Sequence, residues 1–61
     1  MQTLTECWEV AEFDYERGVW VVLRMRKFAD GTYAADEIAT FTRDEAPTRA
    51  DAIALALNPR G

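Results

Sequence analysis

The stretch GVWVVLRMRK, residues 18–27, decides how this chain folds. Its β-branched and aromatic residues predict a strand, and side chains alternate between the two faces of a strand. Both faces of this one are apolar: Val19, Val21, Leu23 and Met25 point to one side, and Trp20 and Val22, followed by Arg24 and Arg26, point to the other. A protein of this size is expected to bury one face of a sheet, so the stretch raises the question of what covers the second.

Length and composition restrict the answer. The chain has 61 residues, 49% of them hydrophobic and 30% charged, with a net charge of −4. These values predict a single small globular domain over residues 1–61, near the lower size at which a chain folds alone. The N-terminus lacks the pattern of a signal peptide, and no apolar run is long enough for a membrane span. With a lone Cys7, which we expect to fill a strand, the chain is predicted to be cytoplasmic.

The pattern along the chain predicts three strands and a helix, an α+β fold of order β-β-β-α. The strands are expected at about 4–13, 19–28 and 32–41, the first two joined by a turn with Gly18. Asp30-Gly31 predicts a two-residue type I′ hairpin turn before the third strand. Thr48 as N-cap, with Asp51 three residues later, predicts a helix over about 49–57, which ends before Pro59.

Counting back from the two turns predicts the register of the sheet. Both hairpins then give the same three rows across the strands: Phe13–Trp20–Phe41, Ala11–Val22–Ala39 and Glu9–Arg24–Glu37. Directly opposed aromatic and oppositely charged pairs stabilise antiparallel sheets, and a slip of one residue would destroy all three rows.

We expect the helix to cover the face with fewer central charges. That face carries Trp8, Val10, Val21, Leu23, Met25 and Ile38, and the helix would meet it with Ala50, Ile53, Ala54 and Leu57, which recur at helical spacing. The aromatic row would then stay uncovered and form a partner surface. The predicted partner-binding residues are Phe13, Trp20, Val22, Phe41, Glu9, Arg24 and Glu37. Two alternatives stay open: the tail or the connector 42–48 folds over this face, or the helix covers it and leaves the other open.

Catalytic signatures are absent from the sequence. It has no His, one Cys and three scattered glycines, so general-base, metal and phosphate-loop chemistry lack their usual residues. Adjacent acids in a strand, such as Asp36 and Glu37, point to opposite faces and cannot act as a catalytic pair. We therefore predict a protein that is not an enzyme, with no cofactor and no metal.

The order G-x-W-V, DG turn, third strand ending in Phe41-Thr42 and Ala-rich helix resembles the three-strand-plus-helix DNA-binding module of AP2 proteins and of the arm domains of tyrosine integrases. The resemblance covers residues 18–57. It implies that the open sheet face enters the major groove, with Trp20, Arg24 and Arg26 at the matching positions. The acidic net charge argues against direct nucleic-acid binding, because Lys and Arg must neutralise phosphates.

By size and charge the chain is also similar to small inhibitors of phages and mobile elements, of which anti-CRISPR proteins are the best-known kind. That resemblance implies a target that handles nucleic acid, and an acidic rim could imitate a short run of phosphates. The rim residues are Glu12, Asp14, Glu16, Asp36, Asp44 and Glu45. The sequence thus predicts a small acidic protein-binding module, an inhibitor of a nucleic-acid-handling complex; the alternatives are the DNA-binding module and a homodimeric regulator or antitoxin that pairs through its open sheet face.

Overall fold

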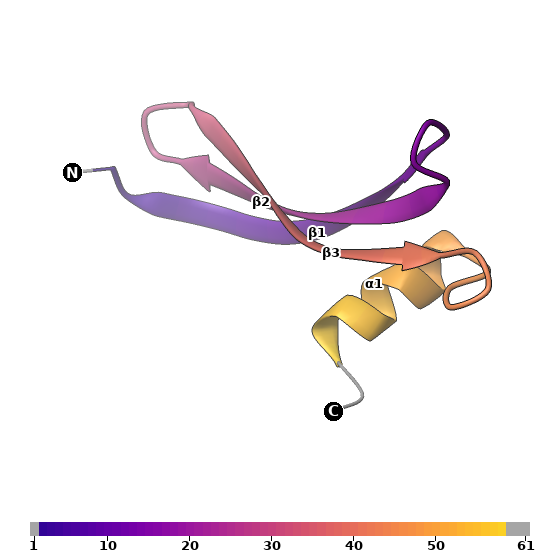
Figure 1. Ribbon diagram of the computed structural model, residues 1–61. Helices are drawn as coiled ribbons and strands as arrows, with labels where there is room; N and C mark the ends of the chain where they lie inside the picture. The colour runs from indigo at the N-terminus through magenta and orange to yellow at the C-terminus, as the bar shows by residue number, and fades with distance from the viewer. Residues whose placement is uncertain (1, 59–61) are drawn as a thin grey trace.

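A computed structural model describes residues 2–58 and shows three antiparallel strands followed by one helix (Figure 1). The strands are β1 (Leu4–Asp14), β2 (Val19–Phe28) and β3 (Tyr33–Thr42), in the spatial order β1-β2-β3, and the helix is α1 (Arg49–Leu57). The predicted α+β class and element order are confirmed, with strand bounds within one residue of those expected.

The first hairpin has the predicted register. Phe13 lies opposite Trp20, Val10 opposite Leu23 and Glu9 opposite Arg24. Its turn closes because Gly18 donates its N–H to the carbonyl of Asp14 at 2.7 Å, and Gly18 has a φ of 69°, which suits a residue without a Cβ.

The second hairpin differs from the predicted two-residue turn. Phe28 donates its N–H to the Thr32 carbonyl at 2.9 Å, and Gly31 donates to the Phe28 carbonyl at 3.0 Å, so the loop has three residues. A type I′ turn needs positive φ at both central residues, whereas only Gly31, at 88°, has one. Asp30 instead accepts the N–H of Thr32 at 3.0 Å and its hydroxyl at 2.6 Å, an Asx-type arrangement that favours the longer loop.

The two ends of the second hairpin differ in register by one residue, and a β-bulge at Ile38 accounts for the difference. Val22 lies opposite Ala39 and Trp20 opposite Phe41, as expected, but Leu23 lies opposite Glu37. The extra residue shifts the rest of β3 by one position. The predicted row Glu9–Arg24–Glu37 is therefore wrong: Arg24 faces Asp36, and Glu37 moves to the opposite face of the sheet.

Helix α1 begins as the sequence predicts. The Thr48 hydroxyl accepts the N–H of Asp51 at 3.2 Å, and the Asp51 carboxylate accepts the N–H of Thr48 at 3.2 Å, which completes a capping box. The helix ends at Leu57 with Asn58 as C-cap; Pro59, which was expected to follow its end, lies outside the described residues.

The predicted helix-covered face is wrong, and the alternative in which α1 covers the aromatic row holds. In the part of the chain that the structure describes, the buried residues are Ala11, Val22, Ala46 and Ala52, and Trp20, Phe41 and Ile53 pack against them. Ala46 in the connector contributes to this core, because the chain turns back over the aromatic end of the sheet. Leu57, expected to face the sheet, is 47% exposed, and Ala50 and Ala54 are exposed too.

The helix covers only part of its face. Nine helical residues span about 14 Å, whereas a ten-residue strand spans about 34 Å. In Figure 1, α1 lies under the end of the sheet near the β1–β2 turn, and the other end projects beyond it. The radius of gyration is 13.0 Å, against about 10.5 Å for a compact domain of this length. The fold is thus elongated, with a small core at one end.

Candidate interaction surface

The face of the sheet that points away from α1 carries a continuous group of apolar side chains. Strand alternation places on it Trp8, Val10, Val21, Leu23 and Met25, all half-buried by their strand neighbours. No described element lies over these side chains (Figure 1). We call this surface the open face. It is the face that the sequence had assigned to the core, and Trp8, expected inside, lies on it.

An aromatic pair and a lysine occupy the end of the open face that lies beyond the helix. Trp8 and Tyr33 meet edge to face with ring centroids 6.4 Å apart, and the Lys27 ammonium lies 5.8 Å from the Tyr33 ring centroid. Tyr33 is 59% exposed. Among the described residues Lys27 has no carboxylate within ion-pair distance, although Glu6 is its register partner on β1.

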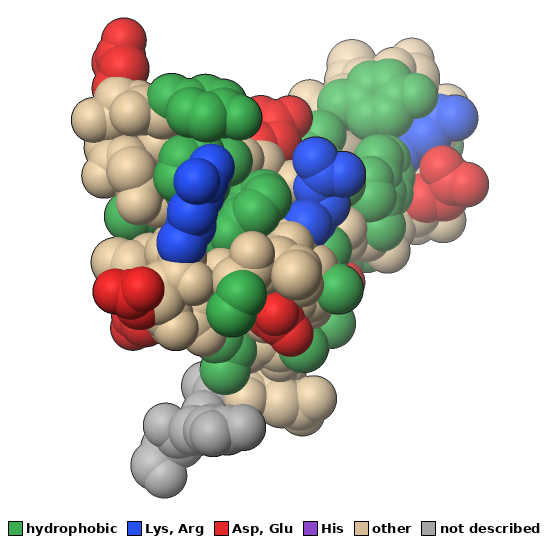
Figure 2. Space-filling view, turned by 90° about the vertical axis from the view of Figure 1, so that its right-hand side faces the viewer, with side chains coloured by type: hydrophobic (Ala, Val, Ile, Leu, Met, Phe, Trp, Pro, Cys, Tyr) green, Lys and Arg blue, Asp and Glu red, His purple; other side chains and the backbone are tan. Residues whose placement is uncertain are grey.

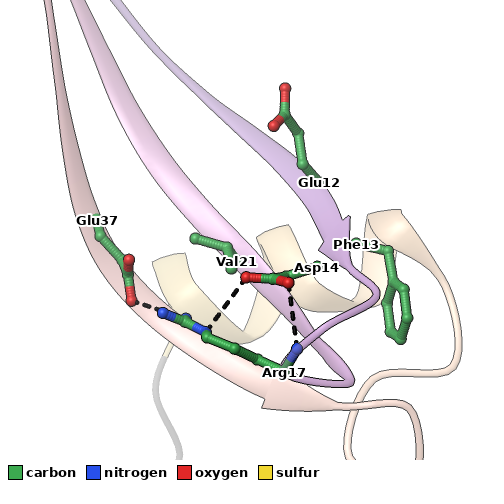
Figure 3. A pocket seen from close by; sticks show the side chains of 6 residues that line it. All are labelled: Glu12, Phe13, Asp14, Arg17, Val21 and Glu37. Carbon is green, nitrogen blue, oxygen red and sulfur yellow. Dashed lines mark hydrogen bonds and ion pairs between the residues drawn. The ribbon is translucent and has the colours of Figure 1, made fainter.

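A small polar cluster occupies the other end, near the β1–β2 turn. Arg17 reaches Asp14 at 3.4 Å and Glu37 at 3.1 Å, and the three side chains line a shallow cavity of about 290 Å³ together with Glu12 and Val21 (Figure 3). The Glu12 carboxylate points away from Arg17 in this view and has no hydrogen-bond or ion-pair partner in residues 2–58. The bulge creates this cluster, because it brings Glu37 to the open face.

The predicted aromatic partner surface is instead part of the helix-side core. Phe13 and Trp20 pack edge to face with centroids 5.3 Å apart, and Arg43 lies 4.0 Å from the Phe13 ring. Val22 is 0% exposed, and Phe41 packs beside it. These four residues do not form an uncovered face, because α1 and the connector lie over them.

The predicted charged binding residues are split between the two faces. Arg24 pairs with Glu9 at 3.3 Å on the helix side of the sheet, where Arg26 also pairs with Asp36. Glu37 lies on the open face. The residues that match the DNA-contacting positions of the AP2-type module, Trp20, Arg24 and Arg26, therefore lie on the helix side and not on the open face.

The predicted acidic rim is not one surface. Glu12 and Asp14 lie at the turn end of the open face, Glu16 lies in the turn, and Asp36 lies on the helix side. Asp44 and Glu45 belong to the connector, where Glu45 accepts the N–H of Thr42 at 2.9 Å. Figure 2 shows acidic groups separated by basic and apolar side chains on the end of the molecule that it presents.

Other candidate chemistry is sparse in the described part of the chain. Cys7, expected to fill the strand interior, is a free and exposed thiol. Residues 2–58 contain no group of three or more acidic, Cys or His side chains that could hold a metal ion. No described helix has the length and apolar character needed to cross a membrane.

Comparison with known proteins gives no relative: no family model, curated protein or solved structure matches this chain. Its function has therefore to be argued from its own surfaces.

Proposed function

We propose that this chain is a non-catalytic protein-binding module and that the open face is its binding surface. The observation that carries the proposal is a contiguous apolar strip, Val21–Leu23–Met25 with Val10 and Trp8 beside it, over which no described element packs. Exposed apolar patches of several hundred Å² usually mark interfaces, because water contact with such a patch is costly.

The small core supports the same proposal. Among residues 2–58 only four side chains are buried, and three of them are alanines. The total exposed area is 4463 Å², against about 4,000 Å² for a compact monomer of 6.9 kDa. Covering the open face would supply the apolar burial that α1 alone does not.

More narrowly, we propose that the chain inhibits a nucleic-acid-handling complex. The net charge of −4 supports it, because a basic nucleic-acid site attracts an acidic protein. The turn Asp14–Gly18 is the most suitable contact, since Glu16 is exposed there and Glu12 lies close by without a partner in the described chain. A homodimeric regulator is the second candidate, since the apolar open face of one copy could be covered by that of another.

Site-specific photo-crosslinking in cells that produce the protein tests the proposed binding surface. A photo-reactive amino acid at Met25 should give a defined protein adduct, whereas the same group at Asp44, exposed in the connector, should give none of comparable yield. A group at Glu16 tests the narrower form: an adduct with a nucleic-acid-handling protein supports it. Failure of Met25 to give any protein adduct would contradict the proposed binding surface.

A further inference from the structure

We propose that the outer edge of β1 binds a basic, extended segment of another protein, which adds to the sheet as a fourth strand. This inference rests on the proposed function, because it names the chemistry of a partner at the margin of the same surface. In this arrangement the apolar side chains of the segment lie beside Trp8 and Val10 and widen the open face.

The outer edge of β1 is free along most of its length. β1 is an outer strand of the sheet and pairs only with β2, so alternate backbone N–H and carbonyl groups point away from the sheet. From Glu6 to Phe13 the backbone of β1 has no backbone hydrogen-bond partner in residues 2–58 other than β2. A row of unpaired groups of this kind is completed by the backbone of an added strand.

The other outer strand, β3, offers the poorer docking edge. The bulge at Ile38 interrupts its register with β2, and bulges protect outer strands against further pairing. In β1 the register runs without a shift from Glu6 to Asp14. β1 therefore provides the longer regular edge for strand addition.

Two acidic side chains on β1 flank an apolar centre. Glu6 and Glu12 both lie on the open face, about 20 Å apart, with Trp8 and Val10 between them. Both carboxylates are exposed, and neither has an ion-pair partner in the described chain. The Glu12 carboxylate points away from Arg17 (Figure 3). Both ends of the apolar centre thus present a negative charge to a neighbouring strand.

The bases near β1 leave these two charges uncompensated. Lys27 is the register partner of Glu6, but its ammonium lies 5.8 Å from the ring centroid of Tyr33 on β3, away from β1. Arg24 pairs at 3.3 Å with Glu9, which lies on the helix side of the sheet. Residues 1–16 themselves contain five acids and no Lys or Arg. Charge complementarity therefore favours a basic partner at this edge.

The register of β1 defines the sequence pattern of the partner, because side chains of neighbouring strands meet in directly opposed pairs. Basic residues lie opposite Glu6 and Glu12. Apolar residues lie opposite Trp8 and Val10, which gives the pattern basic-x-apolar-x-apolar-x-basic. The position opposite Ala11 requires a small side chain, since Ala11 is buried against the core on the helix side.

A second copy of the chain does not match this pattern. β1 carries four acids and no base, so the pairing of two β1 edges would bring like charges together, which destabilises a sheet. A basic segment, by contrast, is what a nucleic-acid-handling protein offers, because such proteins neutralise phosphates with Lys and Arg. The inference thus gives the proposed target a chemistry and a contact site.

Titration of the purified chain with a synthetic peptide tests the inference. The probe is acetyl-Lys-Thr-Val-Thr-Val-Thr-Lys-amide, and the control peptide has the same composition with both lysines adjacent at one end. The control should bind about threefold more weakly, because only one of its lysines can meet a carboxylate of the open face. Equal binding of the two peptides, or no binding of the probe at millimolar concentration, would overturn the inference.

Charge reversal on the chain tests the same contact from the other side. Glu12→Lys should weaken binding of the probe about tenfold, because an attraction becomes a repulsion. Asp44→Lys makes the same change of charge in the exposed connector and should weaken binding by less than about twofold. Circular dichroism reports the folding of both variants. Equal losses in the two variants would mean that the probe responds to net charge alone and would overturn the proposed site.

Amide hydrogen exchange locates the bound probe. Strand addition should protect amides of β1 between Glu6 and Glu12 that exchange in the free chain, while amides of residues 33–37 on β3 keep their rates. Shift changes at Leu23 and Met25 without this protection would overturn edge binding but keep the open face as the binding surface. Absence of a Met25 adduct in cells, with β1 still protected by the probe, would instead contradict the proposed function.

Discussion

Trp8 and Trp20 lie on opposite faces of one sheet, Trp20 against the core under α1 and Trp8 edge-on to Tyr33 on the open face. A sheet with a large aromatic residue on each face and a nine-residue helix cannot bury both. The helix covers Trp20, and Trp8 stays on the open face, which we propose as the binding surface.

Ala52, at the contact between α1 and the sheet, leaves no room for a larger side chain. Ala52 is 0% exposed between α1 and the sheet, so Ala52→Leu should destabilise the protein by about 1–3 kcal/mol through overpacking. Ala54→Leu is the matched control in the same helix, since Ala54 is exposed and its replacement should change stability by less than about 0.5 kcal/mol. Urea denaturation at one protein concentration measures both; equal losses would mean that α1 is rotated from the orientation described.

Two apolar residues of α1, Ile53 and Leu57, should contribute unequally to the free energy of unfolding. Ile53 packs against the core, so Ile53→Ala should cost about 2 kcal/mol. Leu57 is 47% exposed, and Leu57→Ala should cost less than about 1 kcal/mol. Thermal denaturation separates them, because 1 kcal/mol shifts the midpoint of a small domain by about 4–8 °C. A Leu57 loss as large as that of Ile53 would instead support the face that the sequence predicted.

Deletion of Ile38 tests the bulge. Without this residue, Leu23–Glu37 pairing follows Val22–Ala39 in an unbroken ladder, so the deletion should keep every side chain on its present face. Deletion of Ala35 removes the same number of residues, but it forces Asp36 and Glu37 to exchange faces. Cross-strand NOEs should therefore survive the first deletion and change in the second. Loss of the native Leu23–Glu37 contacts on deletion of Ile38 would contradict the register.

The pKa of Asp30 should report the hydrogen bonds that hold the loop between β2 and β3. The hydroxyl of Thr32 and then its N–H, with the side-chain amide of Gln2, hold the pKa of this carboxyl below its ordinary value. A lowered pKa contributes stability that is present above the unfolded pKa and is lost as the pH falls through the folded pKa. Thr32→Val should raise the pKa of Asp30 in an NMR titration, whereas Thr40→Val, on β3 away from the loop, should leave it unchanged. An unaltered value in Thr32→Val would exclude the hydroxyl as its main cause.

Much of the fold follows from local rules in the sequence. The capping box at Thr48, the Gly18 turn and the pairing of Phe13 with Trp20 depend on neighbouring residues, and all three are confirmed. The sequence predicts the position of the turn at Asp30-Gly31 correctly but its length wrongly. The same Asp-Gly pair also suits a three-residue loop in which Gly31 alone has a positive φ. The bulge at Ile38 then follows, since the two ends of the hairpin differ by one residue.

The choice of face could not be read from the apolar pattern. Both faces of β2 are apolar, and the helix offers small residues all round, so two docking orientations have similar patterns. The central charge of Arg24 predicts that the helix avoids the aromatic face, but α1 is short and covers only the Phe13–Trp20–Phe41 end of that face, so Arg24 lies beyond the helix. A comparison of the predicted helix length with the predicted strand lengths could have shown that the helix covers only one end of a sheet face.

Single-tryptophan fluorescence tests the central claim most directly. Trp20→Phe leaves Trp8 as the reporter and removes a buried indole N–H that has no acceptor in the described chain; Trp8→Phe leaves Trp20. Acrylamide should quench the emission of Trp8 more strongly than that of Trp20 in the isolated chain, because α1 and the connector cover only Trp20. Circular dichroism of both variants confirms that the chain stays folded. Stronger quenching of Trp20 than of Trp8 would contradict the claim and place the uncovered face on the helix side of the sheet.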